Sequence, residues 1–110
     1  MSVAVYGKTP VRGDFIARRA PDDFVERWHE WCAGGLASAK ETLGGRYAEF
    51  YSCAPIWRFA LDAGICGAAP AIGIMSPSAD SVGRFFPLTL FSLGATEIGS
   101  AQSLLANLDW

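Results

Sequence analysis

Residues 56–93 read IWRFALDAGICGAAPAIGIMSPSADSVGRFFPLTLFSL, and this stretch decides the fold. It contains three runs of strand length that are rich in aliphatic and aromatic residues, Ile56–Leu61, Ala69–Met75 and Arg84–Leu93. Clusters of Gly, Pro and Ser separate the runs, as is typical of turns between consecutive strands. The stretch therefore predicts an antiparallel meander.

The chain before this stretch predicts two further strands and a long helix. Residues 3–6 form a short apolar run, and residues 11–16 supply a second short strand after a loop rich in Gly and Pro. Over residues 23–43, apolar side chains recur at steps of three and four, which predicts a helix with one apolar face. Asp23 and Glu26 have the spacing of a capping box at its start.

Two shorter helices complete the prediction. One spans residues 46–53, and its inward-facing residues are expected to be Tyr47, Phe50 and Tyr51. The other begins at the capping residue Ser100. The order strand, strand, helix, three strands, helix is longin-like and predicts the α+β class, with an antiparallel sheet of about five short strands and helices packed on it. Because the last helix reaches Trp110 without a terminating residue, we expect residues 1–110 to be a single domain truncated at its C-terminus.

Composition excludes several classes of protein. The chain is 51% hydrophobic with a net charge of −2, which excludes a disordered chain and gives no basic stripe for nucleic acid. Residues 1–8 lack the pattern of a secretory signal, and the longest uncharged apolar run, residues 63–75, is shorter than the ~20 residues that span a membrane. Three cysteines without a C-x-x-C spacing, Cys32, Cys53 and Cys66, indicate reduced thiols. We therefore expect a cytoplasmic protein without membrane insertion.

Three motifs follow one another along the chain. Residues 6–15 read YGKTPVRGDF, residues 75–88 read MSPSADSVGRFFPL, and between them Trp28-x-x-Trp31 precedes APIWRF at residues 54–59. The first matches Y-G-K-x-P-x-x-G-D-F and the last matches P-S-x-D-x-V-G-R-x-F-P-L, two patterns of the TagF/ImpM family. In this order the three motifs resemble that family of type VI secretion-associated proteins.

The resemblance implies a function. Members of the family are accessory proteins of the bacterial type VI secretion system that are associated with post-translational repression of secretion. It implies a non-catalytic regulator that acts by protein–protein binding, without a cofactor or a metal. It also implies partners within the secretion system, and the forkhead-associated scaffold protein is the candidate. The sequence leaves the oligomeric state open.

The polar residues of the motifs are the candidate site residues. They are Lys8, Arg12 and Asp14 on the first loop, Ser78, Asp80 and Arg84 on the loop before the last strand, and Arg58, which faces away from Trp57 and Phe59 on its own strand. If the two loops lie at one end of the sheet, they form a polar cluster of mixed sign. Asp14–Arg84 or Asp80–Lys8 pairs lock the loops together, or the cluster recognises a polar group of a partner, such as a phosphorylated side chain, and both interpretations can hold at once.

The other motif residues are interpreted as structural. They are Gly7, Gly13, Trp28, Trp31, Pro55, Trp57, Gly83 and Pro87. The glycines allow tight turns or close backbone approach, and the prolines stiffen or end the segments that contain them. The tryptophans, together with Phe59, Phe85 and Phe86, are expected in the core.

An enzyme and an inert structural fragment are the alternatives. A small phosphate-handling hydrolase would use Asp14, Ser78, Asp80 and Arg84. The single histidine, His29, is expected at the surface or its boundary rather than as a base, because no candidate nucleophile lies near it in the sequence. The Cys and His spacings do not fit a zinc site, and two aspartates make a poor site for a divalent cation.

Overall fold

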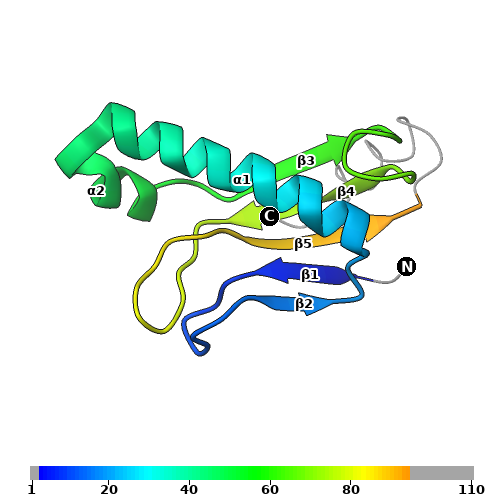
Figure 1. Cartoon of the computed structure of the whole chain (residues 1–110), viewed down its shortest axis with the longest axis horizontal. Coiled ribbons are helices and arrows are strands. Elements are labelled where there is room, and N and C mark those ends of the chain that lie inside the picture. Colours follow the sequence, from blue (N-terminus) through cyan, green and yellow to red (C-terminus); the bar gives the residue numbers. More distant parts are fainter. Residues whose placement is uncertain (1–2, 95–110) are drawn as a thin grey trace.

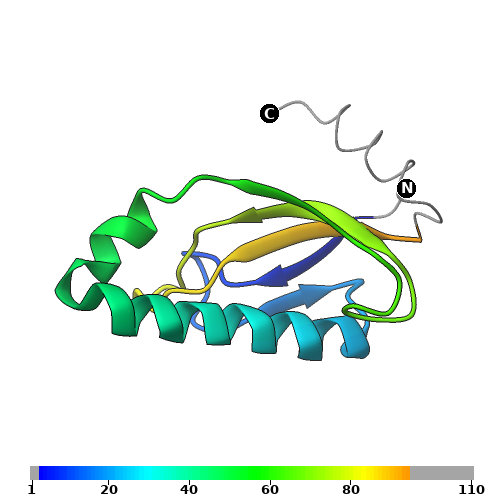
Figure 2. The ribbon, with the colours of Figure 1, turned by 90° about the horizontal axis from the view of Figure 1, so that it is seen from above.

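The computed structural model describes residues 3–94 and contains one antiparallel five-stranded sheet with the order β2-β1-β5-β4-β3. A long helix, α1, lies across one face of the sheet (Figures 1 and 2). The elements are β1 (Ala4–Gly7), β2 (Ile16–Arg18), α1 (Asp22–Leu43), a 3₁₀ helix (Gly44–Arg46), α2 (Tyr47–Ser52), β3 (Trp57–Leu61), β4 (Ala71–Ser76) and β5 (Leu88–Leu93). The predicted α+β class is confirmed. The helix expected from Ser100 lies outside the described residues.

The predicted meander forms the centre and one edge of the sheet. β3 pairs antiparallel with β4, and β4 with β5. β1 then pairs with β5 on one side and with β2 on the other, again antiparallel. The two edge strands, β2 and β3, are consecutive in the chain, and the helical segment between them crosses from one edge of the sheet to the other (Figure 1).

Helix α1 packs on the sheet through a narrow aromatic stripe. Its buried residues are Phe24, Trp28 and Cys32, spaced by four positions. The ring of Phe24 stacks on Phe91 with centroids 4.0 Å apart, and Trp28 stacks on Phe59 at 4.7 Å. The indole Nε1 of Trp28 donates a buried hydrogen bond of 2.8 Å to the hydroxyl of Thr89. This contact satisfies the polar atoms of both residues inside the core.

Gly73 makes room for this aromatic packing. It pairs with Phe59 on β3 and with Phe91 on β5, so it occupies the middle of the row of residues beneath α1. A Cβ atom at position 73 would run into the carbonyl oxygen of Leu90 and into the Cα and Cβ atoms of Phe91. Any larger residue at this position would displace the strand to which α1 is anchored.

Two strands are shorter than predicted because two loops occupy part of their length. The second strand begins at Ile16 rather than at residue 11, and β5 begins at Leu88 rather than at residue 84. Residues 8–15, called here the first loop, and residues 77–87, called the second loop, bond to each other instead of continuing the sheet. Hydrogen bonds within and between the two loops take the place of strand pairing here, which a strand pattern does not reveal.

The predicted capping box is wrong. The residue at the N-cap of α1 is Pro21, and no side chain caps the helix. One carboxylate oxygen of Asp23 accepts a hydrogen bond of 2.9 Å from the backbone N–H of the next residue, Phe24. Asp22 and Asp23 both lie in the first turn, where negative charge favours the helix dipole.

Three aromatic residues expected to face inward are exposed. Trp31 is 62% exposed, Trp57 57% and Phe50 45%. Trp31 packs beside Trp28 with ring centroids 5.1 Å apart, but three positions along the helix turn it toward the edge of the buried stripe. Phe50 instead lies under the guanidinium of Arg46, 4.7 Å from its ring centroid. The side of the molecule where α1 meets β3 is therefore apolar and open.

The described helices carry no membrane-spanning segment. Between residues 3 and 94, neither helix combines the length and the apolar character needed to cross a bilayer.

Candidate functional site

The first and second loops meet at the same end of the sheet (Figure 1). The backbone N–H of Ser81 donates a hydrogen bond of 2.7 Å to the carbonyl oxygen of Arg12. The hydroxyl of Ser78 donates a second one, also 2.7 Å, to the carbonyl oxygen of Lys8, 70 positions away in the chain. The two motifs therefore form one surface, which we call the two-loop site.

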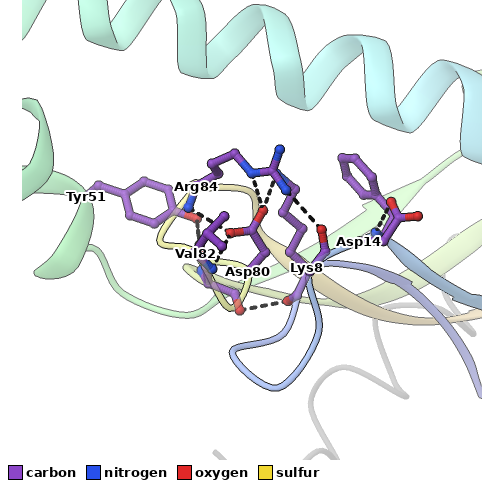
Figure 3. A network of polar contacts seen from close by, with 9 residues as sticks. Lys8, Asp14, Tyr51, Asp80, Val82 and Arg84 are labelled. Atoms are coloured by element: carbon purple, nitrogen blue, oxygen red, sulfur yellow. Dashed lines mark hydrogen bonds and ion pairs between the residues drawn. The ribbon is translucent and has the colours of Figure 1, made fainter.

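A single buried carboxylate holds the two-loop site together (Figure 3). The side chain of Asp80 has no exposed area, and four donors surround it. One oxygen accepts hydrogen bonds from the backbone N–H groups of Val82 and Arg84, at 3.1 and 2.9 Å. The other lies 2.7 Å from the guanidinium Nε of Arg84 and 3.2 Å from the ammonium of Lys8. Asp80 thus closes the second loop on itself and ties it to the first.

The carboxylate of Asp80 stays ionised although it is buried. Burial favours the neutral acid and acts to raise its pKa. The backbone N–H of Arg84, the side chains of Lys8 and Arg84 and the backbone N–H of Val82 oppose this and hold the pKa of Asp80 well below its ordinary value. Two cations around one anion leave the cluster with a positive charge.

Arg84 reaches across to the first loop without an acidic partner there. Its second terminal nitrogen donates a hydrogen bond of 2.9 Å to the carbonyl oxygen of Gly13. The Asp14–Arg84 pair considered from the sequence is not formed: Arg84 pairs with Asp80, and Asp14 accepts a 2.7 Å bond from the backbone N–H of Phe15. Of the two candidate ion pairs, the structure contains the one between Lys8 and Asp80. The side chain of Arg84 remains 63% exposed.

Gly7 lies where the strand before the first loop passes the end of the second. Its φ of 142° belongs to the range that residues with a Cβ atom rarely adopt. A Cβ atom here would also collide with the carbonyl oxygen of Pro87. Both observations fit the interpretation of Gly7 as a residue of close backbone approach. Gly83, with a φ of 87°, makes the turn inside the second loop.

Helix α2 supports the second loop through Tyr51, a contact that the motifs do not predict. The Tyr51 hydroxyl donates a bond of 2.6 Å to the carbonyl oxygen of Ser78 and accepts one of 2.9 Å from its N–H. The Tyr51 ring also stacks on Phe85, with centroids 4.3 Å apart. Burial raises the pKa of Tyr51, against the opposing effect of the Ser78 bond, so the phenol keeps the proton that it donates.

An aromatic cluster lies beneath the two loops and includes the single histidine. Nδ1 of His29 lies 2.7 Å from the hydroxyl of Tyr6, and its ring stacks on Phe86 with centroids 5.0 Å apart. Phe15 packs edge-to-face on both His29 and Phe86. The ammonium of Lys8 lies 4.9 Å from the centroid of Phe15. His29 is half-buried, so it lies at the boundary, as expected from the sequence, and it contacts Tyr6 and Phe15, the first and last residues of the first motif.

The exposed part of the two-loop site carries apolar tips flanked by charges. Val11 is 86% exposed on the first loop, and Val82 is 71% exposed on the second. Arg12 and Asp14 are exposed beside Val11, and Arg84 lies two positions after Val82. Because these two valines are exposed, they do not stabilise the core, and exposed apolar side chains on ordered loops are typical of a surface that contacts another molecule.

The remaining motif residues lie away from this end of the molecule or beneath it. Arg58 lies on β3, opposite Ile74, at the edge of the sheet that is farther from the first loop. Trp31 and Trp57 line an apolar cleft of about 190 Å³ together with Tyr51 and Pro87. Pro55 lies between α2 and β3. Of the seven polar residues predicted from the sequence as site candidates, the structure places six in the two-loop site, and only Arg58 lies elsewhere.

The geometry does not support the hydrolase alternative. The Ser78 hydroxyl is a donor to a carbonyl oxygen, so no base withdraws its proton. Asp80 is enclosed by donors, and His29 is engaged with Tyr6. Within residues 3–94, no three His, Cys, Asp or Glu side chains are grouped so that they could hold a metal ion.

Comparison with known proteins agrees with the motifs. The family model described as the TagF N-terminal domain, type VI secretion system-associated, matches residues 4–110. The crystal structure of PA0076 from Pseudomonas aeruginosa PAO1 is similar to this chain, with a TM-score of 0.83 and 37% sequence identity. The match covers 96% of this chain and 54% of that one, so this chain spans about half the length of that protein. No curated protein matches the sequence.

Proposed function

Because the chain belongs to the TagF N-terminal domain family of type VI secretion-associated proteins, we propose that it is a non-catalytic regulatory module. In this proposal it acts in the cytoplasm by binding another component of the secretion system through the two-loop site. Its effect is post-translational repression of secretion, as the family resemblance implies. Three free cysteines, of which Cys53 is exposed, are compatible with a reducing compartment.

The observation that carries the proposal is the buried Asp80 cluster beneath an exposed loop surface. Ionic contacts in the interior fix both loops relative to each other, so their tips are preorganised. Rigid loops lose little conformational entropy when a partner binds. Val11 and Val82 offer apolar area, and the adjacent arginines offer directional donors.

The charges of the site suit an acidic or phosphorylated group on the partner. Arg12 and Arg84 are exposed, and a guanidinium binds carboxylate or phosphate oxygens in a fixed geometry. The exposed Asp14 partly offsets these charges, so a single acidic group fits better than a long acidic tract. The forkhead-associated scaffold protein of the same secretion system is the proposed partner, because the family is associated with it.

A binding experiment with matched surface variants tests the proposal. The scaffold protein is captured on the wild-type chain and on the variants Arg12→Glu and Val82→Asp, whose side chains are exposed in the two-loop site. Arg18→Glu, at the far end of β2 from the first loop, is the control for an equal change of charge. We expect both site variants to lose capture and the control to keep it. Equal capture by all four proteins would refute the two-loop site as the binding surface.

A further inference from the structure

Residues of α1, α2 and the second loop line a hollow of about 370 Å³. Figure 1 shows these three elements at the same end of the molecule. The lining contains two charged residues, Lys40 from α1 and Arg84 from the second loop. Among the described residues that line this hollow, none is acidic. The hollow, called here the basic hollow, therefore favours a negatively charged ligand.

Arg84 is held in place from the side of the loops. Its Nε bonds to the carboxylate of Asp80 at 2.7 Å, and one terminal nitrogen bonds to the carbonyl oxygen of Gly13 at 2.9 Å. These two contacts leave the other terminal nitrogen for a ligand, and the Arg84 side chain is 63% exposed. A guanidinium that is already ordered loses little conformational entropy when it binds an anion. Arg84 is therefore a preorganised donor beside the basic hollow.

The charge at the basic hollow matches that of a phosphate group. Lys8 and Arg84 surround the single carboxylate of Asp80, so that cluster has one positive charge in excess. Lys40 adds a second positive charge. A phosphorylated side chain carries a charge of about −1.5 to −2 at pH 7, whereas a glutamate carries a single negative charge. A phosphate group would therefore neutralise both positive charges, and a carboxylate only one of them.

The uncharged lining suits a side chain that carries the phosphate. Leu36 and Phe85 offer apolar contacts to the carbon atoms of such a side chain. The ring of Tyr47 lies beside Phe85, with centroids 5.7 Å apart, and it lines the same hollow. Burial raises the pKa of Tyr47, so its phenol is protonated at neutral pH and can donate a hydrogen bond to a phosphate oxygen.

We propose that the basic hollow receives a phosphorylated side chain of the partner protein, with Lys40 and Arg84 as the residues that bind its phosphate. This inference rests on the proposed function, because Arg84 belongs to the two-loop site, and it names the chemical class of the group that is bound there. It adds Lys40 and Tyr47 to the binding residues. Both lie outside the three sequence motifs, so the motifs alone could not identify them.

Titrations of the full chain with small ligands test the proposal. The probes are a blocked tripeptide with phosphoserine at its centre, the same tripeptide with glutamate, and inorganic phosphate. Binding is followed by NMR through the backbone amides of Gly83 and Arg84. The phosphoserine peptide is expected to bind about fivefold or more tightly than either other probe, because glutamate lacks the second charge and free phosphate cannot contact Leu36 and Phe85. Equal binding of glutamate peptide or of inorganic phosphate would overturn the assignment to a phosphorylated side chain.

Four variants locate the binding of the phosphoserine peptide. Lys40→Ala removes a cation, and Ala37→Glu places a negative charge in the lining, so each is expected to weaken binding about fivefold or more. Lys40→Arg keeps the charge and is expected to keep binding. Ala33→Glu, one turn before Ala37 and outside the lining, is the control for an added charge.

A stability measurement separates binding from a structural role of Lys40. This residue lies in the last turn of α1, where a positive charge also favours the helix dipole. Melting curves followed by circular dichroism measure that contribution, and Ala37→Glu tests the hollow without removing Lys40. Binding by either Lys40→Ala or Ala37→Glu as tight as that of the wild type would overturn the proposal.

Capture of the scaffold protein, before and after phosphatase treatment, distinguishes this inference from the proposed function. We expect phosphatase treatment to reduce capture by the wild type to the level seen with Lys40→Ala. Capture that needs Arg12 and Val82 but survives phosphatase treatment would overturn this inference and leave the two-loop proposal standing. Peptide binding in the basic hollow, together with capture that no variant weakens, would refute the two-loop proposal while the hollow keeps its ligand class.

Discussion

The ammonium of Lys8 lies 3.2 Å from the carboxylate of Asp80, and this pair joins two motifs that are more than seventy residues apart in the chain. Only 11% of the Lys8 side chain and none of the Asp80 side chain is exposed. Removing one member of a buried pair leaves the other charge without compensation, which costs more than the pair itself contributes. The stability of the loops therefore depends on both residues being present.

Asp80→Asn is expected to lower the melting temperature and to loosen both loops. The amide keeps the shape of the carboxylate, but it has only one acceptor oxygen for four donors and leaves two cations unneutralised. Thermal unfolding followed by circular dichroism measures the change. Asp14→Asn, on the exposed part of the first loop, is the control and should melt with the wild type. An Asp80→Asn variant as stable as Asp14→Asn would contradict the role given to Asp80.

The same carboxylate predicts a loss of stability in acid. The folded-state pKa of Asp80 lies below the ordinary value of 3.8, so between these two values the unfolded chain binds a proton that the folded chain does not. The contribution of Asp80 is therefore complete above about pH 4 and disappears as the pH falls through the folded-state pKa. Urea unfolding at a series of pH values should show a steeper acid limb for the wild type than for Asp80→Asn. Parallel curves would exclude Asp80 as the source.

Thr89→Val is expected to destabilise the chain by about 1–3 kcal/mol, because it leaves the buried indole N–H of Trp28 without an acceptor. The valine has nearly the same shape as threonine, so little packing is lost. Thr89→Ser keeps the hydroxyl and is the matched control for the hydrogen bond. Chemical denaturation measures the free energy of unfolding for both. If Thr89→Ser were the more destabilised variant, the methyl group rather than the bond would be the important part.

The three cysteines are expected to react at very different rates with a thiol reagent. Cys53 is exposed, while Cys32 and Cys66 are buried. Burial, and to a smaller extent the neighbouring Cys66 thiol, raises the pKa of Cys32 to about 12, so very little thiolate forms at neutral pH. Mass spectrometry after brief alkylation of the native chain should find Cys53 modified and Cys32 intact. Alkylation in urea, where all three react, calibrates the measurement.

The secondary structure and the α+β class could be predicted because both follow from the spacing of apolar residues along the chain. The runs that became β3, β4 and β5 are separated by turn residues, and the helix over residues 22–43 has a regular apolar stripe. What the spacing could not show is which part of that stripe the sheet covers. Trp31 and Trp28 look equivalent in the sequence, yet only Trp28 has Phe59 and Thr89 beneath it.

The site was predictable in its residues but not in its contacts. Lys8 and Asp80 are charged members of motifs, so an ion pair between them could be considered. Several other contacts end on backbone carbonyl oxygens, as when Arg84 bonds to Gly13 and Ser78 to Lys8. A carbonyl group is present at every position and therefore leaves no signal in the sequence.

The crowding at Gly7 also limits how this sequence can change over time. A side chain at position 7 is blocked by the carbonyl of Pro87, at the end of the second loop and 80 positions later in the chain. A substitution of Gly7 therefore requires a change in the second loop as well, so positions 7 and 87 are expected to vary together. Among relatives, residues other than glycine at this position are expected only where the second loop differs in length.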